Sequence, residues 1–191
     1  RVMADKLSKA LGQTVVVENK PGAGGTIGAA SVATSEPDGY TIMIGYIGNL
    51  GYAPTIYPHL RYDPVKSFSA VSLVAMVPNV MVVNASLPIH NVKDLIEYPK
   101  KNPDRMSYSS GGNGTAAHIG MAYLCHSAGV KMVHVPYKGS APATQDLLSG
   151  QIQVQFDPTT LPHIAAGRLK WFAILGEKRW PGKPDIPTLK E

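Results

Sequence analysis

The sequence MSYSSGGNGTAAHIGMAYLCHSAGVKMVHVPYKGSAPATQDLLS, residues 106–149, alternates between strand-like and helix-like segments. We predict strands over 106–109 and 131–135. We predict helices from residue 115 to about residue 128, opened by Thr115 as N-cap, and over 141–149, opened by Ser140. Strands that alternate with helices in this way are typical of a parallel sheet covered by helices.

The same alternation extends to both sides of this stretch. Further strands are predicted over 14–18, 40–45, 71–75, 80–84, 151–156 and 169–175. Further helices are predicted over 2–11, ending at Gly12, over 27–34 with Thr26 as cap, and over 92–101 and 161–166. Residues 46–64 look irregular. The fold class is therefore expected to be α/β.

Two of the predicted strands, near 80–84 and 170–175, are expected to cross between two α/β lobes. The boundaries are a first lobe over 1–80, an inserted second lobe over 81–170, and a return into the first lobe over 171–191. The opening helix has no cap before it, and residues 187–191 resemble the start of another element. We therefore expect a chain truncated at both ends, without a visible signal peptide.

Composition and charge exclude several classes of protein. The chain has 191 residues, of which 44% are hydrophobic and 16% charged, so it is globular. The formal net charge is +5, but the basic residues are scattered and do not interleave with aromatics, which argues against nucleic-acid binding. The single cysteine, Cys125, allows no internal disulfide and is expected to be a buried structural thiol.

The strongest candidate site is the segment Ser110-Gly111-Gly112-Asn113-Gly114-Thr115, which follows a predicted strand and opens a predicted helix. A helix start presents unpaired N–H groups and the positive end of the helix dipole. The segment therefore predicts an anion site formed by Ser110, Gly112, Asn113, Gly114 and Thr115, with His118 one turn further on the same face. The alternative is an ordinary tight loop before a capped helix.

A second helix start offers the same chemistry at Ser140 and Ala141, whose N–H groups could hold a carboxylate. Pro142, tolerated only in the first helical turn, supports a helix start there. Asp157 follows a strand and could accept from a ligand, or could simply form a turn with Pro158. Gly48 and Asn49 could line the cleft from the first lobe. The glycine-rich stretch 21–26 is interpreted as a structural turn.

Sequence features of an enzyme are lacking. There is no Gly-x-Ser-x-Gly elbow, no dinucleotide fingerprint and no P-loop. The six histidines lack metal-ligand spacing, and the carboxylates form no obvious acid–base pair. We therefore expect no catalytic residue, no metal and no cofactor.

Several stretches, in order along the chain, resemble the receptors of tripartite tricarboxylate transporters, the Bug or TctC-like periplasmic proteins. They are LGQTVVVENKPGAGG (11–25), PDGYT (37–41), YDP (62–64), YSSGGNGTAAH (108–118), VHVPYKGSAPA (133–143) and PTL (187–189). The family's first strand and its glycine-rich ligand loop, which precede the opening helix, are absent here.

The resemblance implies a type II periplasmic-binding fold, in which two α/β lobes close over a small carboxylate held largely by backbone amides. It also implies a periplasmic location, membrane transporter subunits as partners, and action as a monomer without nucleic acid. Two alternatives remain open at this point: a ligand sensor subunit for signalling, and a carboxylate-processing enzyme on the same fold. The identity of the ligand is not predicted.

Overall fold

The computed structural model describes residues 1–103 and 105–191 and contains, within them, one mixed five-stranded sheet. The strands are β1 (Asn79–Asn84), β2 (Ser107–Ser110), β3 (Val133–Pro136), β4 (Val154–Phe156) and β5 (Leu169–Leu175). They lie in the order β3-β2-β4-β1-β5. β2 is parallel to β3 and β4, whereas β1 is antiparallel to β4 and β5. The predicted α/β class is confirmed.

Helices cover both faces of the sheet because its interior strand β1 is apolar on both sides. The helices are α4 (Val92–Lys101), α5 (Ala116–Ala128), α6 (Ser140–Ser149) and α7 (Leu161–Ala165), with a 3-10 turn, η3 (Pro158–Thr160). On β1, Met81 packs in one core with Leu95 of α4 and Met121 of α5. Val82 packs on the opposite face with Leu147 of α6. Each such fully buried side chain contributes roughly 1.5–3 kcal/mol.

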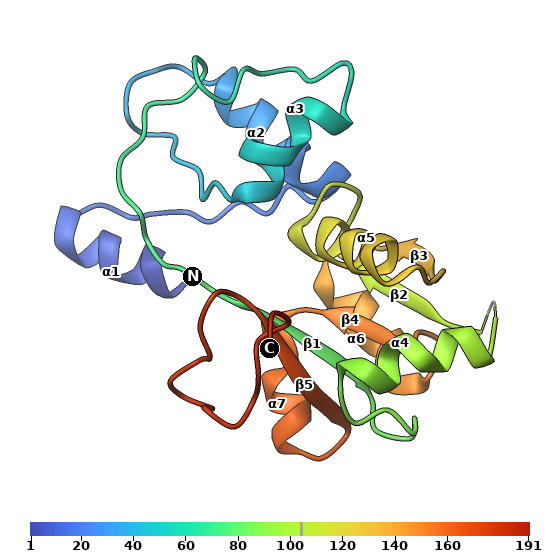
Figure 1. Cartoon of the computed structure of the whole chain (residues 1–191). Coiled ribbons are helices and arrows are strands. Elements are labelled where there is room, and N and C mark those ends of the chain that lie inside the picture. The colour runs from blue at the N-terminus through green and yellow to red at the C-terminus, as the bar shows by residue number, and fades with distance from the viewer. Residues whose placement is uncertain (104) are drawn as a thin grey trace.

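The first 78 residues contain helices but no strand. The elements are α1 (Val2–Leu11), the 3-10 turn η1 (Ala23–Gly25), α2 (Thr26–Ala33), the π-helical turn η2 (Gly48–Tyr52) and α3 (Ala53–Ile56). Figure 1 shows α2 and α3 on one side of the molecule, with a long extended segment leading from them into β1. The prediction of irregular structure over 46–64 missed η2 and α3.

Three predicted strands, over 14–18, 40–45 and 71–75, are wrong. These segments form no ladder, and Val16, Ile44 and Val71 are 78%, 73% and 90% exposed. Their β-branched and aromatic residues favour extended backbone, but a strand also needs a neighbour to accept its hydrogen bonds. The described part of the chain supplies no such neighbour. The composition of these segments therefore predicted an extended backbone, but it did not predict whether another strand would pair with it.

The predicted caps are correct for some helices and wrong for others. Thr115 is the N-cap of α5, and its side chain accepts from the N–H of His118. Gly25 and Gly139, however, occupy the N-cap positions of α2 and α6, so that Thr26 and Ser140 are the first helical residues. Both glycines have positive φ, 86° and 106°. Residues with side chains rarely adopt these conformations, so glycine takes the cap position.

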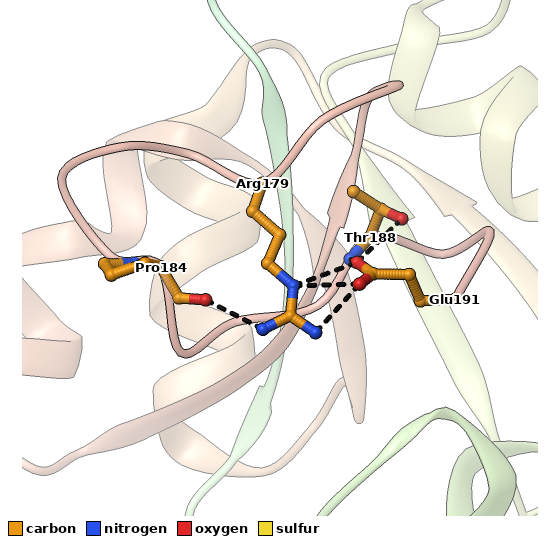
Figure 2. Close-up of polar contacts among 4 residues, drawn as sticks. All are labelled: Arg179, Pro184, Thr188 and Glu191. Atoms are coloured by element: carbon orange, nitrogen blue, oxygen red, sulfur yellow. Dashed lines mark hydrogen bonds and ion pairs between the residues drawn. The ribbon is translucent and has the colours of Figure 1, made fainter.

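The last residues fold back against β5. The N–H of Ile174 donates to Pro187 O at 3.0 Å, and the N–H of Leu189 donates to Ile174 O at 3.0 Å. Figure 2 shows that Arg179 ties this segment together by pairing with Glu191, with Nη2 2.8 Å from Oε1. The Arg179 contact lowers the pKa of Glu191 to about 2. Glu191 also accepts from the N–H of Thr188, which is half of a capping box.

No helix within residues 1–103 and 105–191 combines the length and the apolar character that crossing a bilayer requires.

Candidate functional site

Three of the predicted site segments meet at one edge of the sheet. The loop 110–115 follows β2, the turn 137–140 follows β3, and Asp157 follows β4. Because β3, β2 and β4 are parallel neighbours, their carboxyl ends share an edge. Ligands bind at this kind of edge in open α/β sheets. The sequence expectation that these residues come together is consistent with the topology.

The starts of α5 and α6 lie side by side at this edge. The N–H of Tyr137 donates to Ser110 O at 2.9 Å, which joins the two loops. A Cβ placed on Gly111 would lie 3.7 Å from Gly139 Cα and 3.8 Å from Ser140 N. The two loops are therefore in direct contact at Gly111 and Gly139.

Several backbone donors at the two helix starts donate to no other described residue. They are the N–H groups of Asn113, Ala116 and Ala117 at α5, and of Gly139, Ser140 and Ala141 at α6. Both helix dipoles place partial positive charge at the same edge. Such an arrangement can bind a carboxylate without a charged side chain.

The side-chain hydroxyls of this loop are used by the loop itself. Ser110, 1% exposed, donates to Gly112 O at 3.0 Å and accepts from the N–H of Gly112 at 3.2 Å. Thr115 Oγ1 donates to Gly112 O at 2.8 Å. The hydroxyls therefore shape the loop. Contact between these residues and a solute stays a prediction.

Beneath the loop lies a stack of three rings from three elements. His134 of β3 stacks on His118 of α5, with ring centroids 4.0 Å apart, and on Tyr108 of β2, at 4.9 Å. His118 Nδ1 accepts from the N–H of Gly114 at 3.2 Å. Burial, and secondarily the charge of His118, lowers the pKa of His134 to about 4, and burial also lowers the pKa of His118. Sequence reasoning missed His134, because the residues of β3 do not indicate which ring of another element will lie against the His134 ring.

The turn 22–25 in the first part of the chain touches the loop after β2. A Cβ on Gly24 would collide with Asn113 O, and a Cβ on Gly112 would lie 3.0 Å from Gly24 N. The hydroxyl of Tyr57 donates to Asn113 O at 2.9 Å, and the hydroxyl of Tyr46 donates to Gly24 O at 2.6 Å. From the sequence this stretch was interpreted as a structural turn. In the structure it lies next to the candidate site.

Gly48 and Asn49 lie behind that turn. The Asn49 side chain is buried, and its Oδ1 accepts from the N–H of Tyr46 at 2.9 Å. Its Nδ2 donates to no described residue and lies 3.5 Å from the position of a Cβ on Gly25. Gly48 is also buried, under the ring of Tyr46. Asn49 therefore supports the turn, and its amide is the group that could face outward.

Asp157 belongs to a buried polar network. Its Oδ1 accepts from the N–H and the hydroxyl of Thr159 at 2.8 and 2.6 Å, which caps η3. Its Oδ2 accepts from Gln155 Nε2 at 3.4 Å, and Gln155 in turn accepts from Thr144 of α6. From the sequence, Asp157 was interpreted either as a ligand contact or as a turn residue. Its position at this edge of the sheet is compatible with both interpretations. Its observed partners are those of the turn.

Metal and thiol chemistry have no support within residues 1–103 and 105–191. No group of three or more His, Cys, Asp or Glu residues gathers there to hold a metal ion. Burial raises the pKa of the half-buried Cys125 thiol, which keeps it protonated and unreactive. Two surface hollows, one beside Cys125 and one beside His59 and Arg61, are lined by none of the predicted site residues. The candidate site is therefore identified by the backbone N–H donors at the starts of α5 and α6.

In a comparison with known families, a family model matches residues 1–191. The family is described as "Tripartite tricarboxylate transporter family receptor", TctC. The chain spans 56% to 58% of the length of the first curated relatives it matches.

Three solved structures share both sequence and fold with this chain. The periplasmic binding protein BugD is 42% identical with a TM-score of 0.92, over 98% of this chain and 63% of its own. An R. palustris protein with adipate is 36% identical with a TM-score of 0.95, over 99% and 64%. MatC from Rhodopseudomonas palustris, with bound malate, is 31% identical with a TM-score of 0.92, over 100% and 65%.

Proposed function

Because this chain belongs to the TctC family of tripartite tricarboxylate transporter receptors, we propose that it captures a small organic carboxylate and presents it to membrane transporter subunits. One observation carries the proposal: α5 and α6 begin side by side, and their first N–H groups donate to no other described residue. Unpaired amides and two dipoles of the same sign favour an anion over a neutral solute.

The ligand class is a carboxylate, most simply a dicarboxylate. Solved relatives contain adipate and malate. A carboxylate offers two acceptor oxygens, so it can bridge donors from both helix starts. Asn113, which is exposed and next to the contact with Gly24, could add a side-chain donor. Amide recognition of this kind fixes the carboxylate and leaves the rest of the ligand to neighbouring side chains.

Binding is proposed to couple to closure between two lobes, with boundaries at 1–80, 81–170 and 171–191. The proposal is supported by topology, since β1 begins and β5 ends at the edge that carries the site. It is also supported by the contacts of Gly24 and Tyr57 with Asn113, which join the two parts of the chain. A ligand that touches both parts shifts the molecule toward the closed state through its differential affinity.

We infer that the chain binds its ligand without transforming it. Among the predicted site residues the carboxylate is that of Asp157, and both of its oxygens accept hydrogen bonds from Thr159 or Gln155. It is therefore engaged as a cap, which does not fit a free general base. A periplasmic location, a monomer and the absence of nucleic-acid binding complete the proposal. The scattered basic residues support the last of these.

Isothermal titration of the intact protein with malate, adipate and citrate tests this proposal. We expect saturable one-to-one binding of at least one acid, and no binding of the matched dimethyl ester, which lacks the negative charge. Binding of the ester as tightly as the acid would contradict recognition by amides and dipoles. Failure of all three acids would remove the proposed ligand class.

A further inference from the structure

The ring stack beneath the loop 110–115 joins three separate elements. The rings of His134 and His118 are nearly parallel and stacked, with an interplanar angle of 14° and centroids 4.0 Å apart. Tyr108 stacks on the other side of His134 at 24° and 4.9 Å. β2, β3 and α5 are thereby fixed relative to each other directly under the proposed anion site.

Each histidine holds a different part of the loop. His134 Nε2 lies 2.7 Å from Ser110 Oγ, and that oxygen is also bonded to both the N–H and the carbonyl oxygen of Gly112. His118 Nδ1 accepts from the N–H of Gly114 at 3.2 Å. The two rings thus determine the orientation of the peptides on either side of Asn113.

The hydrogen-bond pattern defines the protonation of both rings. A hydroxyl has one hydrogen and two lone pairs. Ser110 donates its hydrogen to Gly112 O and accepts from Gly112 N–H, so the third contact is satisfied only if His134 Nε2 carries a hydrogen and donates. His118 Nδ1 must carry none, because it accepts. His118 is therefore neutral, with its hydrogen on Nε2. His134 carries a hydrogen on Nε2, and its lowered pKa of about 4 keeps its other ring nitrogen unprotonated near neutral pH.

We propose that His134 and His118, as a neutral stacked pair, are positioning residues that hold the loop 110–115 in its anion-binding shape, an inference that rests on the proposed function. The loop needs such support because Gly112 and Gly114, with φ of 137° and 76°, have wide conformational freedom. Ordering a free loop on binding costs affinity, and a loop that is already ordered avoids this cost.

The surroundings of the pair make its function sensitive to acid. The titratable groups that face it are Tyr108 of β2 and, beyond Tyr108, Cys125 of α5, and burial raises the pKa of both. Among the described residues, no carboxylate hydrogen-bonds either ring or contributes to its shift. No carboxylate of the described residues is therefore placed to offset a positive charge on the two histidine rings.

The direction of the pH effect follows from the lowered pKa values. An unfolded or opened loop takes up histidine protons near the ordinary value of 6.5, whereas His134 in the stack does so at about 4. The stabilisation that neutral His134 gives the stack is therefore fully present above that ordinary value and is lost as the pH falls toward about 4. Protonation of His118 Nδ1 also replaces an acceptor by a donor opposite Gly114 N–H. Ligand affinity is expected to fall in the same range.

The test uses paired substitutions that keep or remove one ring atom. His134→Gln keeps a donor near the Nε2 position, and His118→Asn keeps an acceptor near Nδ1, whereas His134→Leu and His118→Leu remove them. His126→Gln, on the exposed end of α5, is the control. Three quantities are measured: the ring tautomers by NMR in the unmodified protein, amide hydrogen exchange at Gly112 and Gly114, and affinity for malate and adipate.

We expect Nε2–H tautomers for both rings. We also expect the leucine variants to raise exchange at these two amides about tenfold or more, while the amides of β1 stay protected. Affinity should fall by a similar factor, and the Gln and Asn variants should restore most of it. An Nδ1–H tautomer, or leucine variants with unchanged exchange at Gly112 and Gly114, would overturn the inference. If the unmodified protein binds neither acid while the exchange effects appear, the proposed function fails and the positioning role stands.

Discussion

Gly24 and Gly112 lie where the turn 22–25 meets the loop after β2. Neither position has room for a side chain, since a Cβ on Gly24 would collide with Asn113 O and one on Gly112 would approach Gly24 N to 3.0 Å. The hydroxyl of Tyr57 donates to the same Asn113 carbonyl. At this scale the site depends on close backbone contact between distant parts of the chain.

Gly24→Ala is expected to weaken carboxylate binding about tenfold or more, because the added methyl separates the turn from the loop. Gly12→Ala is the matched control, since Gly12 has a similar φ, 65° against 59°, and no atom within 4 Å of its Cβ position. Titration calorimetry with malate and adipate measures both variants. Equal affinities in the two variants would show that the contact at Gly24 does not matter for binding.

The sequence could predict where α5 and α6 start but not which residues of other elements contact these starts. The glycine, asparagine and hydroxyl residues of 110–115 and 139–141 mark helix starts, so their location was predictable. The contacts of His134 with Ser110, and of Tyr57 with Asn113, join residues on different elements. Such contacts follow from how the elements pack, which local patterns do not encode.

The starts of α5 and α6 carry the proposed chemistry at the scale of secondary structure. Ser140 is the first residue of α6, and its N–H donates to no described residue. Proline is favoured at this first position and lacks the N–H. Deleting one amide donor is therefore possible without removing the helix.

Ser140→Pro is expected to lower carboxylate affinity roughly 10- to 100-fold, the loss of one hydrogen bond to a charged group. Ser140→Ala, which keeps the backbone N–H, should bind nearly as the unmodified protein does. Calorimetry gives the affinities, and thermal unfolding checks that α6 is intact. Ser140→Pro with unchanged affinity and unchanged stability would exclude this amide from the site.

The elements themselves were predicted well where a ladder or core exists. The predicted strands near 80–84 and 169–175 and the helix over 92–101 are observed with nearly the same bounds. The strands predicted over 14–18, 40–45 and 71–75 are not observed, because these segments form no hydrogen-bonded ladder. Strand composition is a local property, whereas pairing depends on which chain segment lies alongside.

Met81→Ala in β1 is expected to lower the free energy of unfolding by about 2–5 kcal/mol, because Met81 is fully buried between helices and sheet. Met76→Ala is the matched control: Met76 is 86% exposed, so its truncation should change stability by less than about 0.5 kcal/mol. Urea unfolding measures both. A small effect at Met81 would mean that β1 is not the centre of the core.

At the scale of the whole molecule, the chain consists of a well-packed sheet with its helices and a first part, residues 1–78, that contains helices but no strand. Figure 1 shows α2 and α3 above the sheet and the helices packed on it, and α1 apart from them at the left. Exposed apolar side chains concentrate in the extended segments, including Val16, Ile42 and Leu73. These side chains lie in segments that pair with no strand of the described residues.

Amide hydrogen exchange should therefore separate the two parts of chain 1–191. We expect the amides of Met81, Val82 and Val83 to be protected by orders of magnitude, because they lie in a ladder with neighbours on both sides. The amides of Val16, Ile42 and Leu73 should exchange almost as fast as in an unfolded peptide. Strong protection in these three residues would mean that they pair with another segment or with a second copy.

Backbone amide shifts during titration with malate or adipate test the central claim most directly. If the two neighbouring helix starts hold the carboxylate, the largest changes should fall on Asn113, Ala116, Ser140 and Ala141, and they should saturate together. Saturable binding whose shifts lie instead around His59 and Arg61, with the amides of α5 and α6 unmoved, would contradict the account.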